Sequence, residues 1–246
     1  MLAVDTSLEP EIKSNVINYL IKRWMLSSQD LIINEFTVGD FSRRVDLAVI
    51  KSSRLFAFEV KSDSDSLIRL EGQVSKYQEY FDKVIVVTAP RHTVKALELT
   101  PSNVGVWEIS QGVITIKRKG RIKAVNSRKA FIEMMTAVEL KKLSRSLQIP
   151  SPNAKRKTLE RVLDNVAVSK LRNAAIDFIK GRYQSRNDSF FENLETGMST
   201  PDALEHLKLP KKDFTSTDID SFISALEELN QTFGSKSCSN KMVANA

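Results

Sequence analysis

Residues 43–63 read RRVDLAVIKSSRLFAFEVKSD, and this stretch decides the fold. Apolar residues flank the polar pair Ser52-Ser53 on both sides, which predicts two strands joined in a hairpin, Arg43–Ile50 and Leu55–Lys61. Side chains alternate between the two faces of a strand, so Glu59 and Lys61 project together from the second strand. The hairpin therefore carries charged side chains inside apolar strands, where an unpaired charge is costly.

A turn centred on the two serines sets the register of the hairpin. The expected pairs are Ile50 with Leu55, Ala48 with Ala57, Asp46 with Glu59, and Arg44 with Lys61. Directly opposed side chains have Cβ atoms roughly 4.5–5.5 Å apart. The register thus predicts that the carboxylates of Asp46 and Glu59 face each other, with two small alanines beside them.

Two adjacent carboxylates repel each other unless a cation lies between them. Ligation by oxygen alone favours Mg²⁺ or Mn²⁺ over zinc, so Asp46 and Glu59 indicate a metal site. An ion network of both acids with Arg44 and Lys61 accounts for the same spacing, and the spacing leaves the two interpretations open. Glu35 interrupts the apolar run before the hairpin, and its partner is Arg44 or Asp46, depending on register.

The elements around the hairpin predict an α/β domain with a mixed β-sheet flanked by helices, over residues 1–120. The expected helices are 5–26, 67–82 and 93–99, and the further strands are Leu31–Val38, Val84–Thr88, 104–109 and 112–118. Residues 121–233 predict a C-terminal helical extension, with helices at 128–146, 156–183, 201–207 and 218–230. The last residues, 234–246, have the composition of a flexible tail.

The charge of the chain is concentrated in the extension. Residues 117–186 hold 19 basic and 5 acidic residues, a net charge of +14, whereas the whole chain carries +7. Such a block attracts polyanions, because each neutralised phosphate releases counterions. The composition therefore indicates a nucleic acid as a partner, and a Lys-rich solvated surface is the alternative.

The hairpin and the helix after it resemble a known family. Arg43-Arg-Val-Asp-Leu-Ala48 followed by Glu59-Val-Lys-Ser-Asp63 is similar to the core motif of the PD-(D/E)XK nuclease superfamily, which has a restriction-endonuclease-like fold. Gln73-Val-Ser-Lys-Tyr77 resembles the Gln-x-x-x-Tyr helix of its RecB-like members. Within the superfamily, the chain looks most like the small bacterial stand-alone nuclease-like proteins. Val45 stands where the superfamily has its proline.

The resemblance implies a role for each matching residue. Asp46, Glu59 and the carbonyl of Val60 would hold Mg²⁺ or Mn²⁺, and Glu35 would be an accessory ligand. Lys61 would help to activate water and would stabilise charge that develops on the phosphate. Gln73 and Tyr77 would position the DNA backbone or brace the metal ligands.

The extension resembles a SAP-like DNA-binding hairpin over 138–164, although an ordinary helical hairpin that packs on the core fits the same pattern. The expected DNA contacts are Arg44, Arg91, Lys155, Arg156, Lys157 and Arg161. No apolar stretch of the sequence is long enough to span a bilayer, and the lone Cys238 fits a reducing cytoplasm. A nuclease that cuts both strands of a duplex would favour a homodimer.

Two main functions follow from these features, and an RNA nuclease is a third, less favoured alternative. The first is a Mg²⁺-dependent deoxyribonuclease. The second is a DNA-binding or adaptor subunit that keeps the nuclease fold but is catalytically silent or depends on a partner.

Overall fold

The computed structural model describes residues 8–39, 43–194 and 197–208, which all belong to one compact unit. The strands are β1 (Leu31–Val38), β2 (Arg43–Lys51), β3 (Arg54–Lys61), β4 (Lys83–Thr88), β5 (Gly105–Ser110) and β6 (Val113–Arg118). The helices are α1 (Glu9–Trp24), α2 (Leu70–Gln78), α3 (Pro90–Leu99), α4 (Arg128–Glu133), α5 (Ala137–Ser146), α6 (Arg156–Leu163), α7 (Val168–Glu192) and the 3₁₀ helix η2 (Asp202–Leu207). The predicted α/β class, with a mixed sheet flanked by helices and a helical extension, is confirmed.

The six strands form one sheet in the order β1-β2-β3-β4-β5-β6. β3, β4 and β5 run parallel, and every other pair of neighbours is antiparallel. The hairpin register is as expected for Ile50 with Leu55 and for Ala48 with Ala57. Ser52 and Ser53 have φ angles of 48° and 58°, so the two-residue turn is of the primed type that matches the twist of a hairpin, without glycine.

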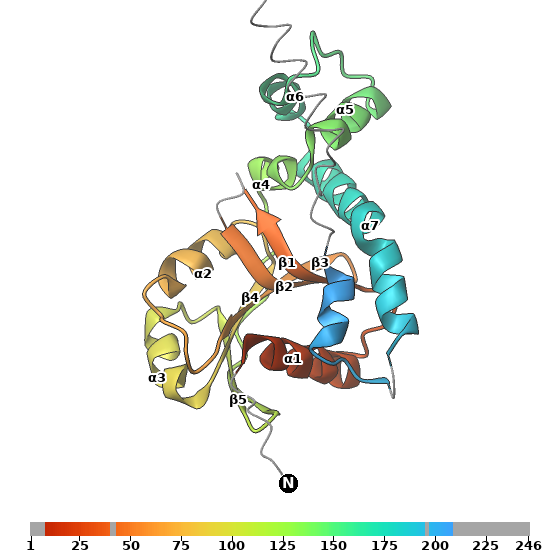
Figure 1. Cartoon of the computed structure of the whole chain (residues 1–246). Helices are drawn as coiled ribbons and strands as arrows, with labels where there is room; N and C mark the ends of the chain where they lie inside the picture. The colour runs from red at the N-terminus through yellow and green to blue at the C-terminus, as the bar shows by residue number, and fades with distance from the viewer. Residues whose placement is uncertain (1–7, 40–42, 195–196, 209–246) are drawn as a thin grey trace, which may run out of the picture. The chain divides into compact units, whose positions relative to one another are not determined.

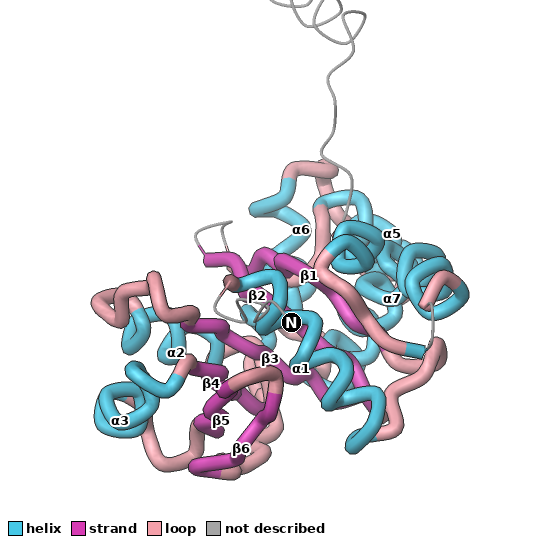
Figure 2. Tube along the Cα trace, turned by 60° about the horizontal axis from the view of Figure 1, so that its bottom comes forward, coloured by secondary structure: helices cyan, strands magenta, loops and turns pink. Residues whose placement is uncertain are grey.

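Helices cover both faces of the sheet, and each face has its own apolar core (Figure 1). α1 and η2 pack on one face, where Ile17, Phe58 and Trp107 are buried. The helices α2 to α7 contribute to the core on the other face, with α5 and α6 lying beyond α4 in Figure 1. Figure 2 shows α1 crossing its face of the sheet beside β1, β2 and β3.

On both β1 and β2, the alternation of side chains between the two faces of the sheet shifts by one residue at the same position. The residues that face α2 to α7 are Ile33 and Phe36 on β1, and Ala48 and Val45 on β2. Simple alternation would not place residues three apart on one face. Glu35 has a left-handed backbone, with φ at 64°, and this accounts for the change on β1. Glu35 and Asp46 lie between the paired residues Asn34–Leu47 and Phe36–Val45, where the ladder between β1 and β2 is interrupted.

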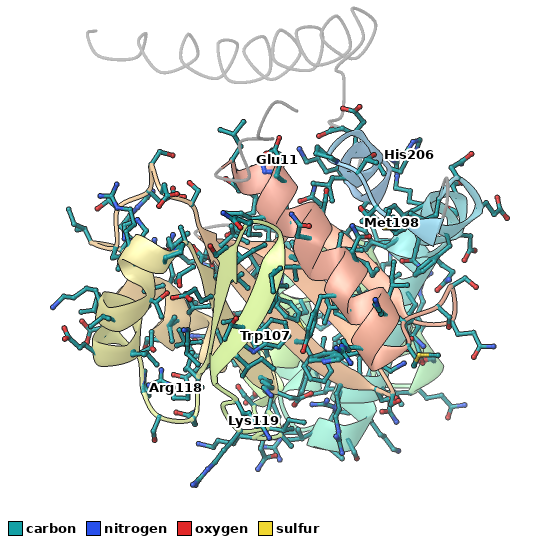
Figure 3. The ribbon with its side chains drawn as sticks, turned by 90° about the horizontal axis from the view of Figure 1, so that it is seen from below. Glu11, Trp107, Arg118, Lys119, Met198 and His206 are labelled. Carbon is teal, nitrogen blue, oxygen red and sulfur yellow. The ribbon has the colours of Figure 1, made fainter. Side chains whose placement is uncertain are left out.

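The edge strand β1 is covered by α7. Asn187 on α7 is fully buried, and its side chain accepts a hydrogen bond from the Ile32 amide at 2.9 Å and donates to the Asp30 carbonyl at 2.8 Å. The segment before η2 is tied to α1 through two hydrogen bonds between Asn18 and Ser199. Figure 3 shows α1 between the strand that carries Trp107 and the segment that carries Met198 and His206.

Two predicted helices are each two helices. The predicted helix 128–146 ends at Glu133 and begins again at Ala137, because Thr136 and Glu139 form a capping box. The predicted helix 156–183 breaks between Leu163 and Val168, and its second part continues to Glu192. The predicted helix 218–230 and tail 234–246 lie outside the described residues, and the boundary near residue 120 stays a prediction. Within the described ranges, no helix is long and apolar enough to cross a membrane.

Candidate active site

Apart from Glu35, the predicted catalytic residues meet in one cavity of about 270 Å³ at the carboxyl end of β3. Its lining comes from β2, β3, α2, the first turn of α1 and the loop before α2. The lining residues are Glu9, Arg43, Arg44, Asp46, Glu59, Val60, Lys61, Asp65, Arg69, Gln73 and Tyr77. Acidic and basic side chains alternate around this cavity, so it could accept both a cation and a phosphate.

Glu59 is the centre of a hydrogen-bond network. Its side chain is almost fully buried, and Lys61 Nζ lies 2.7 Å from Oε1. Gln73 Nε2 donates to the same oxygen at 2.5 Å, while the Tyr77 hydroxyl donates to Oε2 at 2.9 Å. Burial and the charge of Glu59 raise the pKa of Tyr77, so this hydroxyl stays protonated and acts as a donor. The helix spacing of Gln73 and Tyr77 therefore brings both to one carboxylate, as predicted.

Asp46 meets β3 in a different way from the predicted pairing. The ladder between β2 and β3 ends at Leu47 with Phe58, so the expected pairs of Asp46 with Glu59 and Arg44 with Lys61 are not formed. Asp46 Oδ2 instead accepts a hydrogen bond from the Val60 amide at 2.7 Å. This side-chain contact replaces the next backbone bond of the ladder, and the strands separate there.

The charge of Asp46 is less well compensated than that of Glu59. Burial and the nearby Glu59 raise the pKa of Asp46 to about 7, and the Val60 amide and Lys13 only partly oppose this rise. Gln73 Oε1 is buried and has no hydrogen-bond partner among the described residues. A carboxylate short of positive charge and an unused acceptor oxygen are both features that suit a cation with its water molecules.

The residues present therefore fit a magnesium or manganese ion. Among the described residues no group of three or more His, Cys, Asp and Glu side chains could hold a metal. Asp46, Glu59 and the Val60 carbonyl are the groups at this site that could hold such an ion, and water would supply the other ligands. Mg²⁺ commonly keeps several waters and binds through one or two carboxylates.

Glu35 does not reach this cavity. Its carboxylate pairs with Arg44 Nη1 at 2.9 Å and with Lys208 Nζ at 3.1 Å. Burial raises the pKa of Glu35, but Lys208 and Arg44 outweigh burial, so the net pKa is lowered. Of the two partners that the sequence allowed, the structure places Arg44 against Glu35, and the role of accessory metal ligand stays a prediction.

Two residues of α1 beside the site were missed by the sequence reasoning. Glu9 lines the cavity, and Lys13 is buried against it, with Nζ 2.5 Å from Glu9 Oε1 and 3.3 Å from Asn34 Oδ1. Lys13 is only 3% exposed and lies next to Ile12 in the buried face of α1. A lysine inside an apolar helical face is the sequence signal that could have identified it.

The predicted DNA contacts fall into two groups. Arg44 lines the cavity, and Arg91 donates to the Asp63 carbonyl at 2.8 Å, in the loop that leads to α2. The predicted basic contacts on α6 and at its N-cap are exposed, with one exception. Arg156 bonds the Met135 carbonyl at 2.8 Å and pairs with Glu160, so it has a structural role. The exposed members are Lys155, Lys157 and Arg161.

α5 and α6 pack together as a helical hairpin. Leu140 on α5 and Leu159 on α6 are buried in the same apolar core. Lys157 lines a second cavity of about 360 Å³, to which Thr37 from the end of β1 also contributes. Thr37 pairs with Arg44 in the sheet, so the start of α6 lies at the same end of the sheet as the candidate site.

Comparison with known proteins gives a family for most of the chain. A relative, Protein cII of Enterobacteria phage P4, is 36% identical over 191 residues, which cover 76% of this chain and 72% of that protein. A solved protein of unknown function from Silicibacter pomeroyi is 17% identical, with a TM-score of 0.40 over 59% of this chain and 92% of its own, and this likeness carries no argument. The family model described as bacteriophage P4 protein cII matches residues 2–208. Since this match spans most of the sequence, the chain belongs to the bacteriophage P4 protein cII family.

Proposed function

We propose that this protein is a divalent-metal-dependent deoxyribonuclease of the PD-(D/E)XK type. The observation that carries the proposal is the meeting of Asp46, Glu59, Lys61, Gln73 and Tyr77 in one cavity. The five come from two strands and a helix, so their meeting is a property of the fold and not of one local segment. The first of them, Asp46, also has a raised pKa, and perturbed pKa values are frequent among acids at functional sites.

Each side chain has a task that follows from its contacts. A divalent cation at Asp46 and Glu59 would polarise the phosphoryl group and favour attack by water. Gln73 and Tyr77 hold the Glu59 carboxylate in one orientation. Lys61 lies beside that carboxylate and supplies a positive charge for the developing phosphate charge. Arg43, Arg44 and Arg69 would draw the DNA backbone to the cavity.

The exposed cations of α6 extend this surface. Lys157 lies near the end of β1 that adjoins the candidate site, so one strand of DNA could contact both. Backbone contacts of this kind give affinity without base specificity. Action on both strands of a duplex would favour a homodimer, and a cytoplasmic location remains part of the proposal.

A catalytically silent DNA-binding or adaptor subunit is the second candidate. It is favoured by the closed network around Glu59, whose two oxygens already accept three hydrogen bonds. An acid compensated in this way can be stable without a metal. In this case Arg44 and the α6 cations would bind DNA, and a partner would supply the chemistry.

A cleavage assay separates the two candidates. Purified protein is incubated with single-stranded, duplex, nicked and branched DNA, and with RNA, in Mg²⁺, in Mn²⁺ or in a chelator. The nuclease proposal expects metal-dependent cleavage of at least one DNA form, with loss of cleavage in Lys61→Ala but not in the control Lys95→Ala, an exposed lysine of α3. Binding of DNA without cleavage of any form would instead support the adaptor.

A further inference from the structure

A larger cavity, of about 490 Å³, lies at the other end of β4 from the candidate active site. It is enclosed by the end of α2, the start of β4 and the strap 121–127 that connects β6 to α4. The volume is within the range of about 300–1,000 Å³ that is typical of small-molecule sites. The lining residues are Gln78, Glu79, Phe81, Asp82, Lys83, Val84, Asn103, Arg121, Lys123, Ala124, Val125, Asn126 and Ser127.

Three cations of this lining lack a partner. In the part of the chain that the structure describes, the side chains of Lys83, Arg121 and Lys123 take part in no salt bridge and no hydrogen bond. Burial lowers the pKa of Lys83, which is the direction expected of a lysine whose charge is not offset by a neighbouring acid. A cavity with three uncompensated cations attracts an anion.

Both acids of the lining are already neutralised. Glu79 pairs with Lys76 at 2.8 Å. Asp82 pairs with the Arg172 guanidinium and also accepts hydrogen bonds from the Leu55 and Val125 amides. Neither acid is therefore free to offset the three cations.

The strap is anchored by its backbone, which fixes the positions from which the exposed side chains of Arg121 and Lys123 extend. The Lys123 amide donates to the Asp82 carbonyl at 2.8 Å, and the Arg121 amide donates to the Asn103 carbonyl at 2.7 Å. At Gly120 the chain passes the backbone of Gly105 so closely that a side chain would not fit. A strap whose backbone is already ordered loses less conformational entropy when a ligand binds.

We propose that this cavity binds a phosphate-bearing small anion of the size of a nucleoside monophosphate. Lys83, Arg121 and Lys123 would contact the phosphate, and the amides of Asn103 and Asn126 offer hydrogen bonds to the remainder of the ligand. The ligand is separate from the DNA at the candidate active site, because six residues of β4 span roughly 16 Å between the two ends of the strand. The inference stands whether or not the protein cuts DNA.

Calorimetric titration of the full chain in a chelator tests the proposal without any cleavage. The probes are inorganic phosphate, thymidine monophosphate, thymidine and a DNA duplex. We expect the monophosphate to bind and the nucleoside not to bind. The double variant Arg121→Gln/Lys123→Gln should lose about tenfold or more in affinity for the monophosphate, because it loses two charge-assisted contacts.

The matched control is Lys22→Gln/Arg23→Gln, which removes one lysine and one arginine from the exposed end of α1. It should bind the monophosphate as the unchanged protein does. Circular dichroism confirms that both double variants are folded. The proposal is overturned if the monophosphate does not bind, if both variants lose affinity equally, or if only the duplex loses affinity in Arg121→Gln/Lys123→Gln.

Discussion

Two aspartates, the buried Asp82 and the partly buried Asp46, lie at opposite ends of the central strands, and their surroundings differ. Asp82, before β4, accepts hydrogen bonds from two backbone amides and pairs with the Arg172 guanidinium, with one contact at 3.0 Å. Asp46, on β2, accepts one amide hydrogen bond and has a second acid, Glu59, beside it. The negative charge of Asp82 is thus compensated by its neighbours, whereas the negative charge of Asp46 is compensated only in part.

We interpret Asp82 as an acid that stabilises the fold and Asp46 as an acid that is available to bind a ligand. Asp82 connects three parts of the chain: β3, the strap before α4, and α7. Asp46 connects only β2 to β3. Its raised pKa means that the ionised carboxylate is destabilised in the folded protein, and this structural contact alone does not explain why an acid lies there. Replacement of the two residues should therefore affect different properties.

The largest expected effect is on activity. Asp46→Asn should lower the rate of DNA cleavage by about 1,000-fold or more, because it removes a charged metal ligand. Its free energy of unfolding should not fall, since the substitution also relieves repulsion with Glu59. Single-turnover cleavage and urea unfolding measure the two effects. Glu71→Gln, on the exposed side of α2, is the control that should keep its activity.

The next effect is on stability. Asp82→Asn should lower the free energy of unfolding by about 3 kcal/mol, because the Arg172 guanidinium loses its buried counter-charge. Urea unfolding measures this loss. Glu98→Gln, in an exposed pair with Lys95, should change the stability by less than about 0.5 kcal/mol. Equal stabilities for the Asp82 and Glu98 variants would contradict the structural role of Asp82.

A smaller effect is expected from the network around Glu59. Tyr77→Phe removes the hydroxyl that bonds Glu59 Oε2 and the Arg44 carbonyl at 2.8 Å. Groups that orient a metal ligand typically contribute about 10- to 100-fold to affinity or activity, so the cleavage rate should fall within that range. Metal titration of the cleavage rate would show whether the loss comes from weaker metal binding. An unchanged cleavage rate would mean that Tyr77 contributes to packing but that its hydroxyl does not support activity.

The smallest effect is a dependence of stability on pH. The pKa of Asp46 is raised from 3.8 to about 7, so the folded protein holds a proton that the unfolded chain releases. Without metal, the stability of the unchanged protein should fall relative to Asp46→Asn as the pH rises from about 4 to 7. Unfolding at several pH values in a chelator measures this difference. A difference between the two proteins that is constant with pH would contradict it.

Much of the site could be predicted from the sequence because its determinants are local. The two-residue turn at Ser52 and Ser53 fixes the first pairs of the hairpin. The four-residue spacing of Gln73 and Tyr77 places both on one side of α2, from which both reach Glu59. These features depend on strand and helix periods that the sequence displays directly.

The remaining features depend on contacts between distant segments. The left-handed backbone of Glu35 changes the phase of β1 without a glycine to signal it. The side chain of Asn187 accepts a hydrogen bond from the Ile32 amide of the edge strand β1, although the two residues are 155 positions apart in the sequence. The break at Thr136 is an exception, since its capping box with Glu139 is a visible local signal that the longer helical period obscured.

Direct measurement of metal binding tests the comparison between the two aspartates most closely. Mn²⁺ is titrated calorimetrically into the unchanged protein, Asp46→Asn and Asp82→Asn, under conditions in which all three are folded. We predict that the unchanged protein and Asp82→Asn bind Mn²⁺ with similar affinity, while Asp46→Asn binds about tenfold or more weakly. Equal Mn²⁺ binding by Asp46→Asn and the unchanged protein would show that Asp46 is not a metal ligand.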